Sequence, residues 1–241
     1  MPGKLLIPGR RPGSLEPCAS CAVRVTSVCA AIPACDLPRL RAAMTIVLAS
    51  AGETFIQQSE PAKNFSNITN GSAKLYKLMP DGRRQIVGFA GTGHFLGLVG
   101  LETYSFSAEA LEPLRLCCFS RSRLRALLED FPLMQRQLLE RAGHELAAAQ
   151  EQMLLLGRKT ARERLASFLV GQSIRQGSEW GSNMLHLPMT RADIADYLGL
   201  TIETVSRTLT ALRSDGIIEV PAPSLVLIRE RNRLELLAAG Q

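Results

Sequence analysis

Residues 188–216, PMTRADIADYLGLTIETVSRTLTALRSDG, decide how the C-terminal third of the chain is expected to fold. Thr190 is followed three residues later by Asp193, which resembles a capping box and predicts the start of a helix. Apolar residues recur at helical spacing until Gly199 breaks the pattern, and Thr201 can cap a second helix. The apolar positions of that second helix are Ile202, Val205, Leu209 and Leu212. Two short helices joined at a glycine-containing turn predict a helix-turn-helix, whose second helix enters the major groove of DNA.

The second helix carries its polar residues on one face and is expected to end at Gly216 in a left-handed cap. Glu203, Ser206 and Arg207 fall at i, i+3 and i+4. Arginine can bond guanine in a bidentate way, glutamate can accept from cytosine, and serine can contact a base or a phosphate. The alternative is an amphipathic helical hairpin with a solvated charged face. Because caps, turn glycine and polar face agree in spacing, we expect DNA binding.

The whole chain supports a DNA-binding class and argues against two others. Its 241 residues have room for about two domains, and a net charge of +6 suits a nucleic-acid partner. No apolar run reaches the ~18 residues of a membrane span, and the N-terminus has no secretory signal. We therefore expect a cytoplasmic protein without membrane contact. The three histidines are widely spaced and no nucleophile motif is present, so we expect no enzyme.

Six cysteines in a reducing compartment pose a question about metals. In residues 18–35, CASCAVRVTSVCAAIPAC, Cys18 and Cys21 form a C-x2-C pair. Cys29 follows after seven residues and Cys35 after five more. Zinc and iron–sulfur sites both take four such ligands, and the spacing alone does not choose between them. A four-cysteine zinc site that uses Cys35 therefore remains open.

The segment between the cysteines and the helices predicts a small β domain. Residues 1–17 are rich in proline, glycine and arginine and are expected to form a disordered arm. Residues 36–121 alternate short apolar strands with turn signals, which indicates an antiparallel β-roll of the cupin or jelly-roll kind. Cys117 and Cys118 are neighbours in its last strand, so only one of them can face a given site.

The rest of the chain predicts a long helix and a winged helix-turn-helix, which makes the fold class α+β. Residues 122–157 are helical in pattern, with an apolar seam after Pro132 at the spacing of a coiled-coil heptad, which favours dimerisation. The seam consists of Leu139, Ala142, Leu146, Ala149, Met153 and Leu156. The alternative is a helix packed on its own roll. In residues 158–241 a further helix with Leu165, Phe168, Leu169 and Ile174 facing inward precedes the helix-turn-helix and a two-strand wing.

From Cys18 to about residue 229 the chain resembles the CRP/FNR family of transcription regulators. The motif MTRADIADYLGLTIETVSR carries Glu203, Ser206 and Arg207 at the E-x-x-S-R positions of the FNR branch. The runs AKLYKLMPDGRRQIVGF and QMLLLGRKTARERLASFL are typical of FNR and FixK-like members. The resemblance implies a homodimer on inverted repeats of TTGAT type, with Thr201 and Arg191 as further DNA contacts. It also implies that the turn at residues 80–83 touches RNA polymerase.

The branch within the family decides the ligand. Cyclic-nucleotide members use a glutamate and an arginine–serine pair to hold the cyclic phosphate and the ribose, and this chain has Leu98 in place of the glutamate and Phe106 in place of the arginine. An unneutralised phosphate would be costly to bury, so we expect no cyclic nucleotide.

The resemblance instead implies an oxygen-labile [4Fe-4S] cluster, held by three N-terminal cysteines and one from the roll. Cys18, Cys21 and Cys29 match the first three and Cys117 matches the fourth. The implied protein is an activator that responds to oxygen. Two alternatives stay open: a FixK-like regulator without a cluster, and one with a zinc site.

Overall fold

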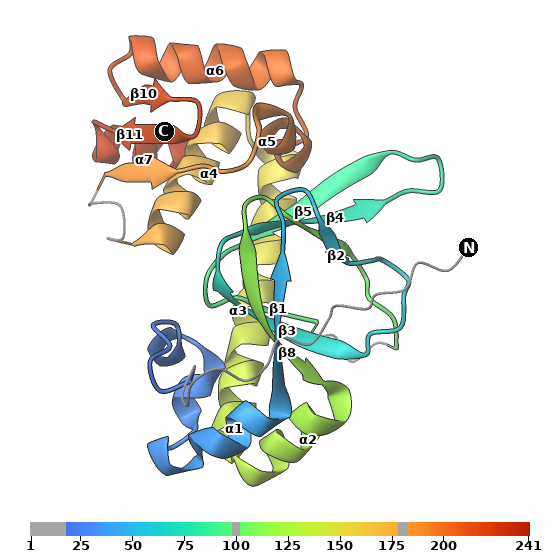
Figure 1. Ribbon diagram of the computed structural model, residues 1–241. Helices are drawn as coiled ribbons and strands as arrows, with labels where there is room; N and C mark the ends of the chain where they lie inside the picture. The colour runs from blue at the N-terminus through green and yellow to red at the C-terminus, as the bar shows by residue number, and fades with distance from the viewer. Residues whose placement is uncertain (1–17, 98–101, 178–182) are drawn as a thin grey trace.

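The computed structural model describes residues 18–97, 102–177 and 183–241. A β-roll with short helices at one end and a winged helix-turn-helix lie side by side, and helix α3 (Pro132–Arg158) runs past both (Figure 1). The predicted α+β class is therefore confirmed. The predicted arm at 1–17 lies outside the described residues. Among the described helices none is both long and apolar enough to cross a bilayer.

The roll consists of two four-stranded antiparallel sheets, with strand orders β1-β8-β3-β6 and β2-β7-β4-β5. Apolar side chains from both sheets meet between them, so alternate residues of each strand face this inner core. The strands are β1 (Met44–Ala49), β2 (Thr54–Ile56), β3 (Asn64–Asn70), β4 (Ala73–Leu78), β5 (Arg84–Ala90), β6 (Phe95–Leu96), β7 (Ser107–Ala110) and β8 (Leu114–Ser120).

The cysteine segment folds as short turns of 3₁₀ helix that the sequence does not predict. These are η1 (Arg24–Thr26), η2 (Val28–Ala31) and η3 (Ala34–Asp36), followed by helix α1 (Leu37–Ala43). Together with helix α2 (Arg121–Asp130) and the start of α3, they cover the outer face of the sheet that contains β8. The roll therefore has a second apolar layer on the outside of this sheet.

Residues 122–157 contain two helices rather than one, α2 and the 27-residue α3. The break falls at Phe131 because Pro132 has no backbone N–H to donate and disfavours helical geometry in the residue before it. Near its start α3 buries Met134 and Leu138 beneath the cysteine segment, and near its end it buries Leu155 in the C-terminal core.

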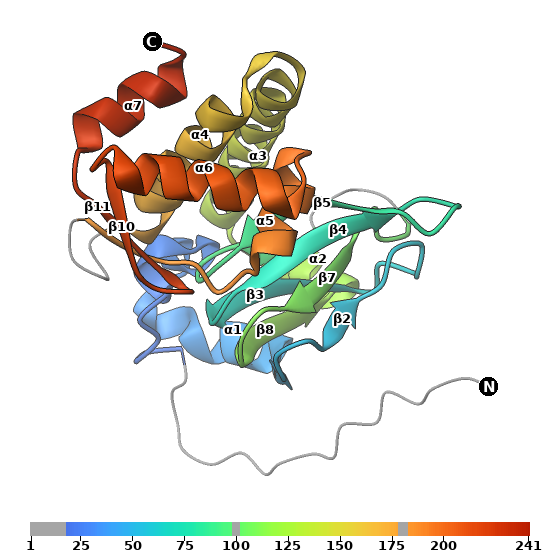
Figure 2. The ribbon, with the colours of Figure 1, turned by 90° about the horizontal axis from the view of Figure 1, so that it is seen from above.

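The C-terminal domain surrounds helix α4 with the helix-turn-helix, a three-stranded sheet and a last helix that the sequence does not predict. Its elements are α4 (Ala161–Gln176), β9 (Met184–His186), α5 (Arg191–Leu198), α6 (Ile202–Ser214), β10 (Ile218–Ala222), β11 (Leu225–Ile228) and α7 (Arg231–Ala239). Figure 2 shows α6 across the front of this domain, with α7 at its edge. Strands β10 and β11 form the predicted wing, with β9 paired to β11.

The inward face predicted for α4 is right in three positions and wrong in one. Leu165, Phe168 and Leu169 are buried, but Ile174 is 69% exposed. At about 100° per residue, nine residues turn the helix so that Ile174 points away from Leu165.

The local signals of the helix-turn-helix are confirmed. The Thr190 hydroxyl accepts a hydrogen bond from the Asp193 amide at 3.1 Å, and the Asp193 carboxylate accepts one from the Thr190 amide at 3.0 Å. Gly199 (φ 61°) and Gly216 (φ 70°) both have the left-handed geometry that the turn and the helix end need. In α6 the predicted apolar positions are buried except Ile202, which is exposed.

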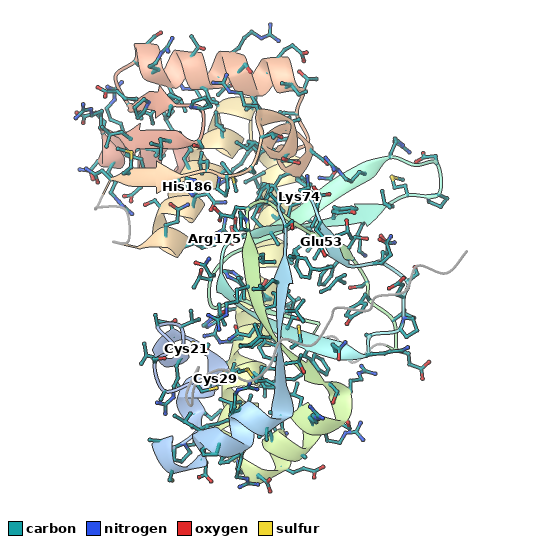
Figure 3. All side chains as sticks on the ribbon, viewed as in Figure 1. Cys21, Cys29, Glu53, Lys74, Arg175 and His186 are labelled. Atoms are coloured by element: carbon teal, nitrogen blue, oxygen red, sulfur yellow. The ribbon has the colours of Figure 1, made fainter. Side chains whose placement is uncertain are left out.

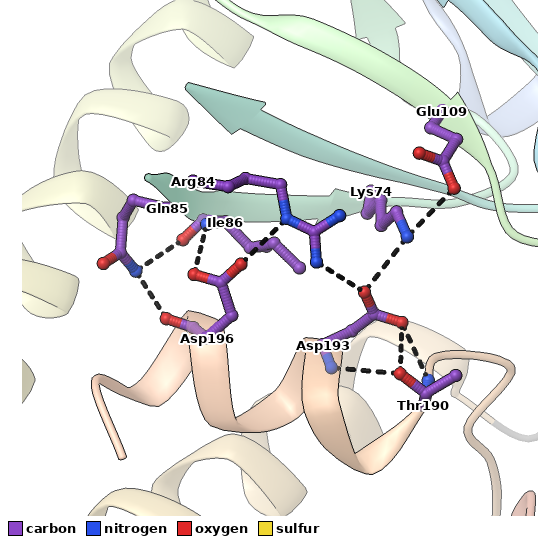
Figure 4. Close-up of polar contacts among 8 residues, drawn as sticks. All are labelled: Lys74, Arg84, Gln85, Ile86, Glu109, Thr190, Asp193 and Asp196. Atoms are coloured by element: carbon purple, nitrogen blue, oxygen red, sulfur yellow. Dashed lines mark hydrogen bonds and ion pairs between the residues drawn. The ribbon is translucent and has the colours of Figure 1, made fainter. Parts of the chain in front are cut away.

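A largely buried ionic cluster joins the roll to α5 (Figure 4). The Lys74 ammonium lies 2.9 Å from Glu109 on the roll and 3.0 Å from Asp193 on α5. Arg84 lies 3.0 Å from Asp196 and 3.4 Å from Asp193. The side chain of Asp193 is 4% exposed, so these charges neutralise each other largely out of contact with water.

A backbone hydrogen bond and aromatic contacts continue this interface. The Asp196 carboxylate accepts from the Ile86 amide at 3.0 Å, and the rings of Phe89 and Tyr197 meet edge to face with centroids 5.2 Å apart. Phe168 of α4 completes the aromatic group, at 6.0 Å from Phe89. Strand β5 is thus fixed against the first helix of the helix-turn-helix.

Asp193 belongs to both the helix cap and the interface, and both sets of contacts affect the pKa of its carboxyl. Burial alone raises the pKa of this carboxyl, but hydrogen bonds from Thr190 and Lys74 outweigh burial, and the pKa lies below its ordinary value. A depressed folded-state pKa stabilises the fold above the unfolded pKa, and the contribution is lost as pH falls through the folded value.

We predict that Lys74→Ala destabilises the protein by about 3 kcal/mol, because it leaves Asp193 and Glu109 without their shared cation. Urea unfolding followed by circular dichroism measures the change. Lys77→Ala, at an exposed position of the same strand, is the control and should alter stability by less than about 0.5 kcal/mol. Equal effects of the two substitutions would show that the ion pair contributes nothing beyond a surface charge.

Candidate DNA-binding surface and cysteine site

The outer face of α6 presents the residues expected to read DNA. Glu203 and Arg207 are exposed, Ser206 is half-buried, and the Thr201 hydroxyl caps the helix by accepting from the Thr204 amide at 3.2 Å. A hydrogen bond from its own backbone amide, assisted by the Thr201 hydroxyl, holds the pKa of Glu203 below its ordinary value. Glu203 is therefore ionised at neutral pH and can accept from a base.

Arg191 joins this face from α5. Its guanidinium lies 3.4 Å from the Ser206 hydroxyl, so the structure brings these two predicted residues together. A groove of about 250 Å³ separates α6 from the turn of the wing, and Arg191 and Arg213 line it with residues 220–223. Two cations beside the base-reading face suit the phosphates of a DNA backbone. Arg213 was not predicted from the sequence.

Four of the six cysteines line one small cavity between the N-terminal segment and the roll. Cys18, Cys21 and Cys29 come from the segment, and Cys117 comes from β8. Figure 3 labels Cys21 and Cys29 at the end of the molecule away from the helix-turn-helix. The enclosed space is about 20 Å³, which is close to the volume that holds one water molecule.

Strand geometry decides which of the two neighbouring cysteines faces this cavity. Cys117 and Phe119 point outward, where Phe119 packs with the segment that carries Cys18 and Cys29. Cys118 points to the inner core of the roll, where its sulfur lies 3.3 Å from the Ser66 hydroxyl. The prediction that the two thiols face opposite ways is confirmed.

Three thiols of this cavity, those of Cys18, Cys29 and Cys117, are held in their neutral form when no ion is bound. Burial, together with a smaller effect of the neighbouring cysteines, raises the pKa of Cys117 to about 12. Burial likewise raises the pKa of Cys18 and Cys29. Any metal that bound here would displace these protons.

The donor set suits a soft metal or an iron–sulfur centre in its chemistry, since four cysteines line one cavity beside apolar residues. As they stand, the described residues contain no group of three or more histidine, cysteine or acidic side chains that could hold a metal ion. Binding therefore requires the sulfurs to adjust around the incoming group. Cys35 is exposed and does not line the cavity. The four cysteines of the cavity therefore differ from the ligands of the zinc alternative, which included Cys35.

The predicted seam of α3 lies bare on the single chain. Leu139 is 74%, Leu146 62% and Met153 66% exposed, and Ala142 and Ala149 are exposed as well. Leu156, at the end of the seam, is half-buried against the C-terminal core. The alternative of a helix packed on its own roll does not fit the middle of α3.

The positions that argued against a cyclic nucleotide are only partly described. Leu98 lies outside the described residues. Phe106 is half-buried and packs against the inner core of the roll.

Comparison with known proteins agrees with both domains. The Crp-like helix-turn-helix domain matches residues 163–237, and the cyclic nucleotide-binding domain matches residues 47–131. The chain is 42% identical to the nitrogen fixation regulation protein FixK of Bradyrhizobium diazoefficiens, over 92% of this chain and 94% of that protein. It is 36% identical to the transcriptional activator protein FnrL of Cereibacter sphaeroides, over 92% of each.

Among solved structures, FixK2 of Bradyrhizobium japonicum is similar with a TM-score of 0.76 and 37% identity. The similarity covers 80% of this chain and 96% of that one. A roll, a long helix and a winged helix-turn-helix with an exposed polar recognition face define a DNA-binding transcription regulator. The chain belongs to the CRP/FNR family, and its relatives are regulators rather than enzymes.

Sequence reasoning missed residues of the interface between the roll and α5 and of the cysteine site. Lys74 and Arg84 looked like ordinary strand charges, since nothing local shows that α5 packs above them. Asn67 and Arg24 line the cysteine cavity. For Asn67 the available signal was an asparagine among the buried positions of β3. No sequence signal marked Arg24.

We predict that Arg207→Ala weakens binding to DNA with TTGAT half-sites by about 1–3 kcal/mol and relaxes the preference at the half-site guanine. Fluorescence anisotropy with matched and guanine-substituted duplexes at one salt concentration measures both effects. Arg125→Ala, an exposed charge on α2, is the control and should leave the preference unchanged. Uniform weakening on all duplexes would instead make Arg207 a phosphate contact.

Proposed function

We propose that this regulator is an oxygen-responsive transcription activator that holds a [4Fe-4S] cluster on Cys18, Cys21, Cys29 and Cys117. The observation that carries the proposal is the common cavity lined by these four thiols, three of which are about a hundred residues from the fourth. When bound, such a cluster supplies an oxygen-labile link between the N-terminal segment and the roll. The other steps depend on the chain's own residues.

The cysteine segment contacts α3, which offers a route from the cavity to the dimer seam. Arg141 of α3 donates to the carbonyl of Thr26 in this segment and, at 3.2 Å, to the carbonyl of Gly93 in the roll. Met134 and Leu138 of the same helix pack in the apolar layer that contains Cys18 and Cys29. A segment fixed to β8 would hold the first half of α3 in one position, and a released segment would not.

Pairing of two chains along the seam explains how this position controls DNA binding. Burial of the exposed leucines and Met153 would stabilise a parallel pair of α3 helices. A symmetric pair would set the two α6 helices ~34 Å apart, which is the spacing of the two half-sites of a palindrome on one face of the DNA duplex. A single chain holds one half-site and loses the free energy of the second, which lowers affinity by orders of magnitude.

The proposal includes two further expectations about partners. The turn between β4 and β5 is exposed, with Arg83 paired to Asp81 at 2.7 Å, and it offers a small charged surface for RNA polymerase. The apolar Phe106 supports a roll that takes no cyclic nucleotide. Both partners of the active protein, DNA and polymerase, are in the cytoplasm, where we expect it to act.

We predict that Cys117→Ala removes the cluster and Cys118→Ala does not, because only the first thiol lines the cavity. Each variant is purified without oxygen, and its visible absorption, iron and sulfide are measured. Cys35→Ala, at the exposed cysteine, is a second control that should retain the cluster. Wild-type protein that takes up no iron and sulfide, or loss of the cluster in Cys118→Ala alone, would contradict the proposed ligand set.

We predict that Leu146→Asp separates the dimer, because a symmetric pair loses two buried leucines and gains two facing charges. At about 1.5–3 kcal/mol for each leucine, the dissociation constant should rise more than about a hundredfold. Sedimentation velocity of the cluster-loaded protein measures the change. Ala148→Asp, exposed on the opposite side of α3, should leave the dimer intact, and dimers in both variants would remove the seam from the interface.

A regulator of the same fold without a cluster is the second candidate. It is favoured by the observation that no group of three ligand side chains in the described part of the chain could hold a metal as it stands. Protein isolated without oxygen that is colourless, free of iron and still dimeric on a palindrome would select this candidate.

A further inference from the structure

Two buried polar atoms at the cysteine cavity have no hydrogen-bond partner. Among the described residues only four buried side-chain nitrogen or oxygen atoms lack one, and Arg24 Nε and Asn67 Oδ1 are two of these four. Both residues line the cavity with Cys18, Cys21, Cys29 and Cys117. Because such atoms are rarely left unpaired in a native protein, an unpaired pair at one site points to a missing ligand.

The chemistry of Arg24 restricts what that ligand can be. A guanidinium only donates hydrogen bonds, so the free Nε–H needs an acceptor. Its Nη2 already donates to the Ile32 carbonyl at 2.9 Å, which fixes the side chain across the segment. No carboxylate forms an ion pair with Arg24 in the described part of the chain, so its charge is also uncompensated. The ligand should therefore be anionic.

Asn67 faces the same space from the roll. It pairs with Cys117 across β3 and β8, and residues directly opposite on neighbouring strands point to the same side of a sheet. The residue is 2% exposed. Its amide can present either the carbonyl oxygen or, after a half-turn, the NH₂ group. It can thus accept from a neutral thiol and donate to a thiolate.

We propose that Arg24 and Asn67 are positioning residues that donate hydrogen bonds to the sulfurs of a bound iron–sulfur centre, with Arg24 also offsetting its negative charge. This inference rests on the proposed cluster. Thiolate and sulfide sulfurs are acceptors, and a centre ligated by four thiolates carries net negative charge in a site that is largely shielded from water. Donors and charges around such a centre set its reduction potential and its retention.

The test uses the full-length protein reconstituted without oxygen with ferrous iron and sulfide, as wild type, Arg24→Gln, Arg24→Lys and Asn67→Ala. We expect Arg24→Gln to lower the midpoint potential and to lose iron to a chelator about tenfold faster. Arg24→Lys should recover most of the potential, because it restores the charge. Asn67→Ala should show a smaller effect in the same direction. Arg125→Gln, which removes an exposed charge on α2 that does not line the cavity, is the matched control.

The outcomes separate this inference from the proposed function. If the wild type takes up iron and sulfide but Arg24→Gln matches it in potential and chelator resistance, the inference fails and the cluster proposal stands. If the wild type takes up neither, both fail. Equal thermal midpoints of the metal-free proteins would show that Arg24→Gln folds normally. A different result would be a lower thermal midpoint for Arg24→Gln that Arg24→Lys restores without restoring the reduction potential. In that case Arg24 has only a structural role and the inference is overturned.

Discussion

A single helix contributes to two separate cores, and this constraint governs the rest of the structure. Helix α3 buries Met134 and Leu138 in the layer outside the roll, and Leu155 in the core of the helix-turn-helix domain. A helix of 27 residues is about 40 Å long and stiff, so what fixes one end also restrains the other. Between these ends most side chains of α3 are exposed, so the same element that links the cores also offers a surface to a second chain.

The contact between roll and helix-turn-helix adds a second restraint to the first. Asp193 is the third residue of α5 and closes its capping box, yet the same carboxylate receives Lys74 and Arg84 from the roll. Removing the carboxylate would therefore weaken a helix end and a domain contact together. The orientation of α6 toward DNA therefore depends on the contact between α5 and strand β5 as well as on the turn between α5 and α6.

Much of the fold could be predicted from the sequence, because the signals there are local. Caps at Thr190 and Thr201 and the glycine at 199 act within a few residues, so the helix-turn-helix was predicted closely. The opposed faces of Cys117 and Cys118 follow from strand geometry alone. By contrast, α7, the turns of the cysteine segment and the partners of Lys74 depend on contacts between distant residues. The error at Ile174 is of another kind, since apolar character was counted without following its angle around the helix.

The shielding of Lys74 and Asp193 has a consequence for how the protein responds to salt. Attraction between exposed arginines and DNA phosphates falls steeply as ionic strength rises, because mobile ions screen it and compete for the phosphates. An ion pair out of contact with water is screened much less. Rising salt should therefore release the protein from DNA while the roll and the helix-turn-helix stay in their mutual orientation, so a dissociated molecule remains ready to rebind.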